Sequence, residues 1–273
     1  MISVVIPAHN EAAVLPRLLD ALSPGVDSTQ LSIVVVANGC SDDTAAVARQ
    51  AEVNVIEIGP GGKIKALNCG DAASSGFPRF YVDADVVVTA RDLEIMASRL
   101  DQRIEAVAPA LHLDDGSSSL LVRSYHRYWG SLPSVRHSLA GRGCFGVTAT
   151  GRDRWDEFPD VVADDQFVNQ QFAADEVAIV AEVSSIVTIP ATLGALVRRK
   201  RRSHRGNLEL AATGVATATT RGGWFGVVRS DPRRLVDLPA FLFVTAVVRF
   251  SGWRERRDDS ASWGADETSR GAS

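Results

Sequence analysis

Apolar strand segments alternate with amphipathic helix segments through the first hundred residues, and this alternation constrains the fold more than any other feature of the chain. The strand segments are largely apolar runs at residues 2–6, 33–37, 53–58 and 80–82. Helical patterns separate them, and begin at Asn10, after Asp43 and at Lys63. Because continuous apolar strands joined by helices are buried on both faces, the pattern predicts an α/β fold with a doubly wound, Rossmann-like, mainly parallel sheet.

The second half of the chain is less regular. Helical patterns cover residues 118–129 and 163–172, and extended patterns cover residues 145–150, 177–180 and 185–189. No internal repeat is visible. With 273 residues the chain has ample length for one large core or two intimate halves.

Composition narrows the class of protein and its setting. The formal net charge of −4 gives no indication of a nucleic-acid partner. Cys40, Cys69 and Cys144 are scattered, without the CxxC spacing of a zinc site or the density of a disulfide framework, so we expect a reducing, cytoplasmic setting. The chain opens directly on strand sequence, which predicts no secretory signal.

A short apolar segment near the end leaves two interpretations open. Residues 238–248 are apolar except for Pro239 and Thr245, and four arginines follow at positions 249, 254, 256 and 257. Since a spanning helix needs about 20 apolar residues, this segment is too short to cross a bilayer. It is either a buried core helix or an interfacial helix on an anionic cytoplasmic leaflet.

Two acidic residues stand where the fourth apolar strand ends, in Asp83-Ala84-Asp85. Carboxylates at the end of a buried strand are difficult to bury and are hard oxygen ligands for a divalent cation, which keeps much of its water and is shared with substrate phosphates. The crevice beyond the carboxyl ends of strands is where open α/β sheets bind ligands. A solvated loop with two acids is the alternative for the pair taken alone.

Four motifs follow the four predicted strands in order. They are Pro7-Ala8-His9-Asn10-Glu11, Asn38-Gly39-Cys40-Ser41-Asp42-Asp43-Thr44, Gly62-Lys63-Ile64-Lys65-Ala66-Leu67-Asn68-Cys69-Gly70 and Asp83-Ala84-Asp85. This series resembles the family-2 glycosyltransferases of the GT-A fold, which use sugar nucleotides. The resemblance extends over roughly residues 2–206, and the order of all four motifs is far more specific than any one of them.

The resemblance implies a role for each matched position. The nucleotide-sugar site it implies consists of Pro7, Ala8, Asn10, Glu11, Asn38, Lys63, Asp83, Ala84, Asp85, Arg202 and Arg205. Within this set, Asn38 would lie at the edge of the base, Lys63 would approach the diphosphate and Asp83 would contact the ribose or nucleotide. Asp85, with His204 as a second ligand, would hold Mg²⁺ or Mn²⁺.

One departure from the family pattern bears on the base. The family often has an aspartate pair before the glycine of the second motif, whereas this chain has Ala37-Asn38. The acid that commonly reads a uracil imide is therefore absent. Uridine diphosphate is the favoured carrier, and guanosine and deoxythymidine diphosphates stay open.

Two later segments resemble the acceptor and catalytic motifs of the family. Residues 141–146 resemble its glycine-rich acceptor segment, in which Gly141 and Gly143 let an acceptor approach the backbone. Asp164 and Asp165 resemble its acidic pair at a helix start. Asp165 would be the general base and Asp164 its partner at the acceptor. An acid that caps a helix is the structural alternative.

A basic run occupies residues 198–206 and includes Arg201, Arg202, His204 and Arg205. It falls where relatives carry a segment that closes over the donor, but it lacks the glutamine and tryptophan of the QxxRW motif. Some of these cations would neutralise the leaving diphosphate, and others would face anionic lipid or an acceptor phosphate. No aromatic platform is interleaved with the charges, which argues against nucleic-acid binding.

The resemblance thus implies an inverting, metal-dependent, hexosyltransferase-like enzyme of polysaccharide, glycolipid or cell-envelope glycan synthesis. Its domains would be a GT-A domain at 1–232, with a nucleotide-sugar half (1–110) and an acceptor half (111–232), a helical extension at 233–257 and a disordered tail at 258–273. The expected acceptor is a hydroxyl of a sugar, a lipid-linked sugar or a small molecule. The enzyme would be cytoplasmic, with peripheral contact at the inner face of the membrane left open.

Three other functions compete with this one. A polyprenyl-phosphate sugar synthase shares the N-terminal motifs and would use a lipid phosphate as nucleophile, without needing a strong base. A non-catalytic nucleotide-sugar-binding module would keep the fold without the reaction. A nucleotidyltransferase would carry an N-terminal glycine-rich loop with a basic signature, which residues 7–11 do not match.

Overall fold

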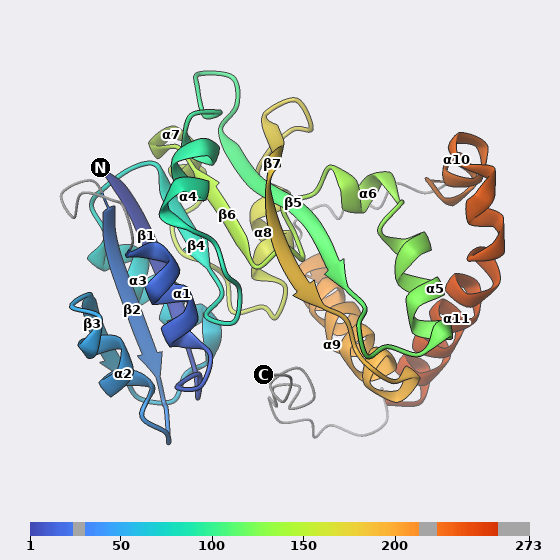
Figure 1. The fold of residues 1–273 in the computed structure, drawn as a ribbon, viewed down its shortest axis with the longest axis horizontal. Coiled ribbons are helices and arrows are strands. Elements are labelled where there is room, and N and C mark those ends of the chain that lie inside the picture. Colours follow the sequence, from blue (N-terminus) through green and yellow to red (C-terminus); the bar gives the residue numbers. More distant parts are fainter. Residues whose placement is uncertain (24–30, 213–222, 256–273) are drawn as a thin grey trace. The chain divides into compact units, whose positions relative to one another are not determined.

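The computed structural model describes residues 1–23, 31–212 and 223–255 (Figure 1). The chain divides into two compact units. The first contains Met1–His112 and His137–Val187, and the second contains Leu113–Arg136 and Thr188–Ser273. The tail predicted at residues 258–273 lies outside the described residues.

A seven-stranded sheet organises the first unit, in the order β3-β2-β1-β4-β6-β5-β7 (Figure 1). Its first four strands are parallel: β3 (Asn54–Ile58), β2 (Leu31–Asn38), β1 (Ile2–Ala8) and β4 (Arg79–Val82). The other three are β6 (Cys144–Val147), which is antiparallel to β4 and β5, then β5 (Ala106–Asp114) and β7 (Val177–Thr188). The predicted α/β fold with a doubly wound, mainly parallel sheet is confirmed.

The strand register brings the predicted motifs to one edge of the sheet. Ala8, the last residue of β1, pairs with Ala37 of β2, and Val5 pairs with Tyr81 of β4. The three strands run in the same direction, so their carboxyl ends meet at this edge. The segments after Pro7, Asn38 and Val82 therefore emerge next to one another, where open α/β sheets bind ligands.

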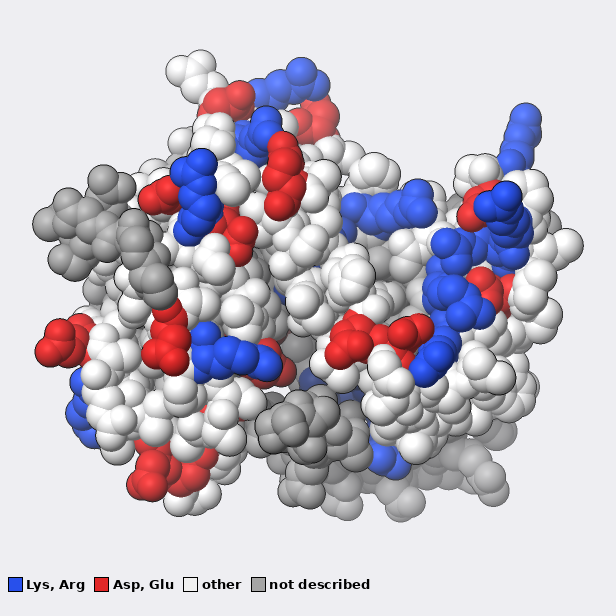
Figure 2. Space-filling view, viewed as in Figure 1, with Lys and Arg blue, Asp and Glu red and all other residues white. Residues whose placement is uncertain are grey.

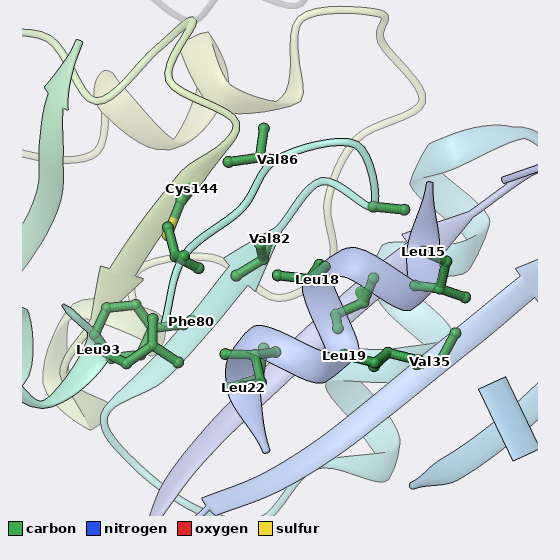
Figure 3. Packing of buried hydrophobic residues seen from close by; sticks show 14 of the residues in the cluster. Leu15, Leu18, Leu19, Leu22, Val35, Phe80, Val82, Val86, Leu93 and Cys144 are labelled. Carbon is green, nitrogen blue, oxygen red and sulfur yellow. The ribbon is translucent and has the colours of Figure 1, made fainter. Parts of the chain in front are cut away.

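Helices cover both faces of the parallel strands. Helix α1 (Leu15–Leu22) buries four leucines at helical spacing against a face that includes Val35 of β2 and Phe80 of β4 (Figure 3). Helix α3 (Gly62–Ala73) packs on the opposite face, where Ala66 meets Val34 and Val36. Successive residues of a strand point to opposite faces, which is why these strands are largely apolar on both faces. Each fully buried leucine stabilises the fold by about 1.5–3 kcal/mol.

The remaining helices are divided between the two units. The first unit has α2 (Thr44–Gln50), α4 (Ala90–Ala97), α7 (Ala149–Arg152) and α8 (Asp164–Asn169). The second unit has α5 (Leu120–Trp129), α6 (Pro133–Arg136), α9 (Leu193–Ala212), α10 (Gly223–Ser230), the 3-10 helix η1 (Pro232–Val236) and α11 (Leu238–Glu255).

Helices α5, α9 and α11 form the core of the second unit. Tyr125 of α5, Leu196 of α9 and Val244 and Val248 of α11 are buried together. The apolar segment of residues 238–248 thus lies on α11 and contributes one side of a protein core. Over the described part of the chain, we find no helix with enough length and apolar character to cross a bilayer.

Several predicted boundaries are wrong. The first helix begins at Leu15 rather than at Asn10, because Asn10 has a left-handed backbone (φ 54°) and Pro16 lies in the first turn. Thr148 ends the predicted strand at 145–150, since its side chain caps α7. The predicted helix at 163–172 is shorter, at Asp164–Asn169.

The predicted strands at 177–180 and 185–189 are one continuous strand, β7. Ala181 and Glu182 are both exposed, and strict alternation starts again at buried Val183, which explains why the sequence pattern predicted two pieces. Helix α4 and strand β5 were not predicted. The sequence could have predicted the start of α4, because Thr89 and Asp92 have the spacing of a capping box and form one in the structure.

Candidate active site

One pocket of the first unit opens at the edge where the motifs meet. Six predicted site residues line it: Pro7, Lys63, Asp83, Gly143, Asp164 and Asp165. They come from β1, α3, the segment after β4, the loop before β6, and α8. Asp83 and the acidic pair Asp164 and Asp165 therefore lie in a single pocket, although about eighty residues of chain separate them.

Lys63 joins the two acidic clusters. Its Nζ atom lies 2.8 Å from Oδ1 of Asp83 and 3.0 Å from Oδ2 of Asp164. The side chain of Asp164 is only 6% exposed, whereas those of Lys63 and Asp83 are about one-third exposed. One ammonium group thus pairs with a buried and a half-buried carboxylate, so one negative charge of the three groups stays unbalanced. The two bound carboxylate oxygens are no further apart than those two distances together.

The electrostatics of the pocket follow from this arrangement. Burial raises the pKa of Asp164 to about 6; Lys63 opposes the shift, and the neighbouring Asp165 and Asp83 add to it. Burial alone would lower the pKa of Lys63, but Asp164, Asp83 and Asp165 outweigh it and raise that pKa above its ordinary value. Lys63 therefore stays protonated in a region of concentrated negative charge.

The two acids of Asp83-Ala84-Asp85 have different surroundings. The backbone N–H of Asp83 donates to the carbonyl of Gly143 at 2.8 Å, and its carboxylate lines the pocket. Ala84 is buried in the core of the sheet. Asp85 is exposed, and its carbonyl accepts a hydrogen bond from Arg17 at 3.1 Å. Of the two acids, Asp83 alone lines this pocket.

The loops after β1 and β2 are tied to each other by hydrogen bonds. Oδ1 of Asn10 accepts the backbone N–H of Ser41 at 2.8 Å, and the N–H of Glu11 donates to Oγ1 of Thr44 at 2.8 Å. These bonds hold the predicted nucleoside segments, which include Ala8 and Asn38, as one rigid surface.

Asn38 carries an unused hydrogen-bond acceptor at that surface. Its side-chain oxygen is buried and has no hydrogen-bond partner among the described residues. Its backbone carbonyl is used, since it accepts from Nδ1 of His9 at 2.6 Å. An unpaired buried acceptor is costly, so a ligand that donates an N–H to this oxygen would gain affinity.

Helix α8 holds the loop at residues 138–143 with two side chains on one helical face. Oδ2 of Asp165 accepts the backbone N–H of Gly141 at 2.6 Å. Four residues later, Oδ1 of Asn169 accepts the N–H of Leu139 at 2.8 Å. The same loop reaches Asp83 through the carbonyl of Gly143. The loop therefore links the two acids, with the carboxylate of Asp165 bound at Gly141 and the backbone N–H of Asp83 bound at Gly143.

Arg142 fixes the loop from within. This arginine is 2% exposed, and its guanidinium donates to the carbonyls of Ser138 at 2.6 Å and Pro109 at 2.8 Å. Its neighbours Gly141 and Gly143 both have left-handed backbones, with φ of 76° and 64°. The two glycines allow the sharp path of the loop, and Arg142 prevents it from moving.

Gly143→Ala is expected to damage both stability and turnover. A Cβ atom at this position would lie 2.3 Å from Cγ2 of Val86, and the left-handed backbone disfavours any side chain. We expect the free energy of unfolding to fall by about 2–4 kcal/mol. Denaturant unfolding measures this change. Gly59→Ala is the matched control, because a Cβ at Gly59 meets nothing within 4 Å; equal losses in the two variants would contradict the expectation.

Several residues that shape the pocket were not predicted as site residues. Tyr81 and Phe145 line it, and their rings stack with centroids 5.0 Å apart. The hydroxyl of Tyr81 donates to buried Asp71, which also pairs with Arg79 and Arg152. Tyr81 and Phe145 lie among apolar residues in the sequence, and this pattern does not indicate that they line a pocket.

Asn68 and Asn169 support the site from behind. Asn68 of α3 binds the backbone of Phe158 twice, with its amide donating at 3.1 Å and its oxygen accepting at 2.8 Å. It thereby fixes the chain just before α8. Asn68 falls within the third motif, and Asn169 lies four residues after Asp165, one helical turn along. These positions could have predicted that both residues support the site.

The predicted cations of the basic run lie on α9. Arg202 and Arg205 are exposed, Arg205 pairs with Glu209 at 2.8 Å, and His204 is half-buried. Helix α9 belongs to the second unit, whereas the pocket belongs to the first. The roles of Arg202, His204 and Arg205 at the donor stay predictions.

The pocket residues fit a hard divalent cation that is completed by a ligand. In the described part of the chain, no three His, Cys, Asp or Glu side chains are grouped closely enough to hold a metal by themselves. Asp83 and Asp85 offer two carboxylates at the strand end. Mg²⁺ and similar cations take one or two protein carboxylates, with substrate phosphates and water in the other positions.

The fold and this pocket define the class of GT-A proteins, in which donor acids at a strand end face a second acidic pair. The model of the family described as "Glycosyl transferase family 2" matches residues 3–156, more than half of the chain. The chain belongs to this family.

Curated relatives match only part of the chain. Glucosyl-3-phosphoglycerate synthase of Mycobacterium tuberculosis (strain ATCC 25618 / H37Rv) is 34% identical over 95 residues, which are 32% of this chain and 29% of the relative. The protein from Mycobacterium bovis matches to the same extent. The chain thus spans less than a third of the length of the curated relatives it matches.

Solved structures share the fold at low sequence identity. A mannosyltransferase from Pyrobaculum calidifontis in complex with GDP-Man and Mn²⁺ has a TM-score of 0.60 at 18% identity, over 95% of this chain and 76% of that one. The M. tuberculosis synthase with Mn²⁺ and UDP-glucose has a TM-score of 0.53 at 21% identity, over 76% and 79%. S. aureus TarS 1-349 with UDP-GlcNAc has 0.54 at 17%, over 75% and 69%.

Proposed function

We propose that this protein is an inverting glycosyltransferase, which moves a sugar from a nucleoside diphosphate sugar to an acceptor hydroxyl. Membership of glycosyl transferase family 2 supports the class of reaction. The single observation that carries the proposal is the ion-paired pocket, in which Lys63 contacts both Asp83 and Asp164. Relatives of the same fold bind UDP-glucose, UDP-GlcNAc and GDP-Man.

The donor would enter where the motif loops meet. The hydrogen-bonded loops after β1 and β2 would hold the nucleoside, and the unused oxygen of Asn38 would accept an N–H of the base. Uracil, thymine and guanine all present such an N–H, so uridine diphosphate stays the favoured carrier, and guanosine and deoxythymidine diphosphates stay open. Lys63 would turn from the carboxylates to the diphosphate, because a stronger anion is then within its reach.

Asp165 would act as the general base. It lines the pocket and is half-buried, whereas Asp164 beside it is buried against Lys63. Asp165 would accept the proton of the acceptor hydroxyl as that oxygen attacks the anomeric carbon and the nucleoside diphosphate departs. Attack from the face opposite the leaving group inverts the configuration. The N–H of Gly141 would hold the carboxylate of Asp165 in place during this step.

Asp85, together with Asp83, would hold a divalent cation, and His204 stays a predicted further ligand. The relatives solved with sugar nucleotides and Mn²⁺ support this cofactor, with Mg²⁺ equally suited to an oxygen ligand set. When bound, the cation would supply positive charge to the diphosphate oxygens.

The activity is expected to depend on pH through Asp164. Its pKa of about 6 means that it is charged at neutral pH and becomes protonated as the pH falls through that value. Protonation breaks its ion pair with Lys63 and alters the charge beside the base. We therefore expect kcat/KM to be level above about pH 7 and to fall about tenfold per unit well below pH 6. Initial rates at subsaturating donor measure this fall of kcat/KM at acidic pH. A fall centred near the ordinary pKa of an aspartate would contradict its attribution to Asp164.

A thermal-shift panel of sugar nucleotides, with and without Mn²⁺, tests the proposal. A UDP-sugar with Mn²⁺ should raise Tm, whereas the same UDP-sugar with chelator should do so weakly. Positive donors then enter a transfer assay with sugar and lipid-linked acceptors, in which nuclear magnetic resonance reads the anomeric configuration of the product. A retained configuration, or no response to any nucleotide, would contradict the proposal.

A polyprenyl-phosphate sugar synthase is the second candidate. The basic run on α9 and the exposed apolar residues of α11 favour it, whereas the position of Asp165 in the pocket favours a hydroxyl acceptor. Side-by-side assays with a polyprenyl phosphate and a lipid-linked sugar separate the two.

A non-catalytic binding module would bind donor without transferring or hydrolysing it. A cytoplasmic location remains part of the prediction.

A further inference from the structure

Helix α11 exposes a continuous apolar stripe. Pro239, Leu242, Phe243, Ala246 and Phe250 are all exposed, and their spacing places them on one side of the helix. Leu242 is 46% exposed, Phe243 50% and Phe250 75%. We call these five residues the α11 stripe. Large side chains of this kind rarely lie next to one another in water on a monomeric protein.

The opposite side of α11 is fixed by the protein. Val244 and Val248 are buried, and Phe241 stacks on Tyr125 of α5 with ring centroids 5.7 Å apart. The helix is therefore apolar around its circumference, as in helices that are buried on all sides. The described residues of the second unit cover only one side of α11. The α11 stripe on the other side therefore has the composition of a buried surface but is exposed.

The segment just before α11 extends this surface. Leu235 and Val236 of η1 are 57% and 81% exposed. Arginines accompany the apolar residues: Arg233 and Arg249 are exposed, and Arg249 lies on the striped side of the helix. In the sequence, further arginines follow at positions 254, 256 and 257. Apolar residues flanked by arginines fit a surface with an apolar interior and an anionic rim.

The charge of the chain is unevenly divided between the units. The second unit carries 18 lysines and arginines against 10 aspartates and glutamates, whereas the first carries 11 against 23. The unit with the stripe thus has a formal net charge of +8, although the whole chain has −4. Figure 2 shows basic side chains gathered over α5 and α10 of this unit. An asymmetry of this size indicates an anionic partner.

Two other occupants fit the surface less well. The chain after residue 255 is polar and small, with Trp263 as its one large apolar residue, so it lacks the side chains to cover the stripe. A second copy would bring two units of charge +8 together, and like charges disfavour that contact. An anionic lipid bilayer satisfies the apolar stripe and the positive charge at once.

We propose that the α11 stripe is a membrane-docking face, which inserts its apolar side chains at the level of the headgroups of an anionic bilayer. Phe243 and Phe250 enter the acyl boundary, while Arg233 and Arg249 contact lipid phosphates. An isolated interfacial helix turns a polar face to water, whereas the side of α11 that faces away from the membrane packs against the rest of the second unit. This inference does not depend on the reaction in the first unit, since it uses residues of the second unit alone.

Vesicle co-sedimentation of the full chain tests the proposal. We expect binding to vesicles of equimolar phosphatidylcholine and phosphatidylglycerol, weak binding to phosphatidylcholine alone, and a loss of binding in high salt. The double variant Phe243→Ser/Phe250→Ser should lower the partition coefficient about tenfold or more. Arg249→Gln should lower it about severalfold on anionic vesicles only.

Matched controls separate docking from general effects. Val162→Ser/Ile186→Ser removes two apolar side chains of the first unit that are 43% and 60% exposed, and Arg91→Gln removes an exposed charge from the same unit. These variants should bind vesicles as the unchanged chain does, and circular dichroism should show all variants folded. Equal binding by the stripe variant and its control overturns the proposal. So does failure of the unchanged chain to bind anionic vesicles, or a dimer in solution that only the stripe variant loses.

Discussion

Asp165→Asn is expected to lower kcat for sugar transfer by about 100- to 10,000-fold while donor binding stays intact. The amide keeps the size of the side chain, and its oxygen still accepts the N–H of Gly141, but it no longer takes a proton from the acceptor. Calorimetry with the donor nucleotide and Mn²⁺, paired with an initial-rate assay, measures the two effects separately.

Asp160→Asn is the matched control for this variant. Asp160 is an exposed carboxylate five residues before Asp165, so the same chemical change is made outside the pocket. The control should transfer sugar at the unchanged rate. A near-normal kcat for Asp165→Asn would remove this residue from the role of base, whereas a loss of donor binding would reassign it to the donor site.

Lys63→Met is expected to lower kcat/KM by about 100- to 1,000-fold, mainly through weaker donor binding. The methionine keeps the length of the aliphatic chain but removes the positive charge that pairs with Asp83 and Asp164. Without it, the donor diphosphate meets two carboxylates with no protein cation between them. The pKa of Asp164 should rise further, because Lys63 now holds it down against the effect of burial.

Lys65→Met controls for the loss of a lysine from the same helix. Lys65 is exposed and lies two residues later on α3, so its side chain points away from the pocket. Donor affinity and the acidic limb of the pH profile should be unchanged in this control and shifted in Lys63→Met. If both variants kept the donor affinity of the unchanged chain, the proposed contact between Lys63 and the diphosphate would be wrong.

The donor side of the pocket could be predicted because strand direction determines it. Once residues 2–6, 33–37 and 80–82 were assigned as parallel strands, the segments after Pro7, Asn38 and Val82 had to meet at one edge. Lys63 followed from its place at the start of the next helix. The periodicity of the sequence was sufficient to bring these segments together, whereas the role of each residue at a donor came from the resemblance to family-2 glycosyltransferases and stays a prediction.

The acceptor side could be predicted only through family resemblance. Nothing in the sequence pattern indicates that α8 approaches Asp83, because the contact depends on the antiparallel strand β6 and on the loop at residues 138–143. That loop is held by side-chain to backbone bonds from Asn169 and Arg142, which leave no periodic signal. An arginine in a glycine-rich loop would ordinarily be assigned to the surface, yet Arg142 is buried.

The clearest test of the account is whether a donor complex at Asp83 also lies beside α8. Mn²⁺ is paramagnetic, so with UDP bound it should broaden the backbone amide signals of Asp83, Gly143 and Asp165 together in the isotope-labelled protein. Mg²⁺ with UDP serves as the diamagnetic reference. The amide of Ser3, near the opposite end of β1, should broaden less than these three. Broadening at Asp83 with unchanged signals at Gly143 and Asp165 would contradict a shared pocket.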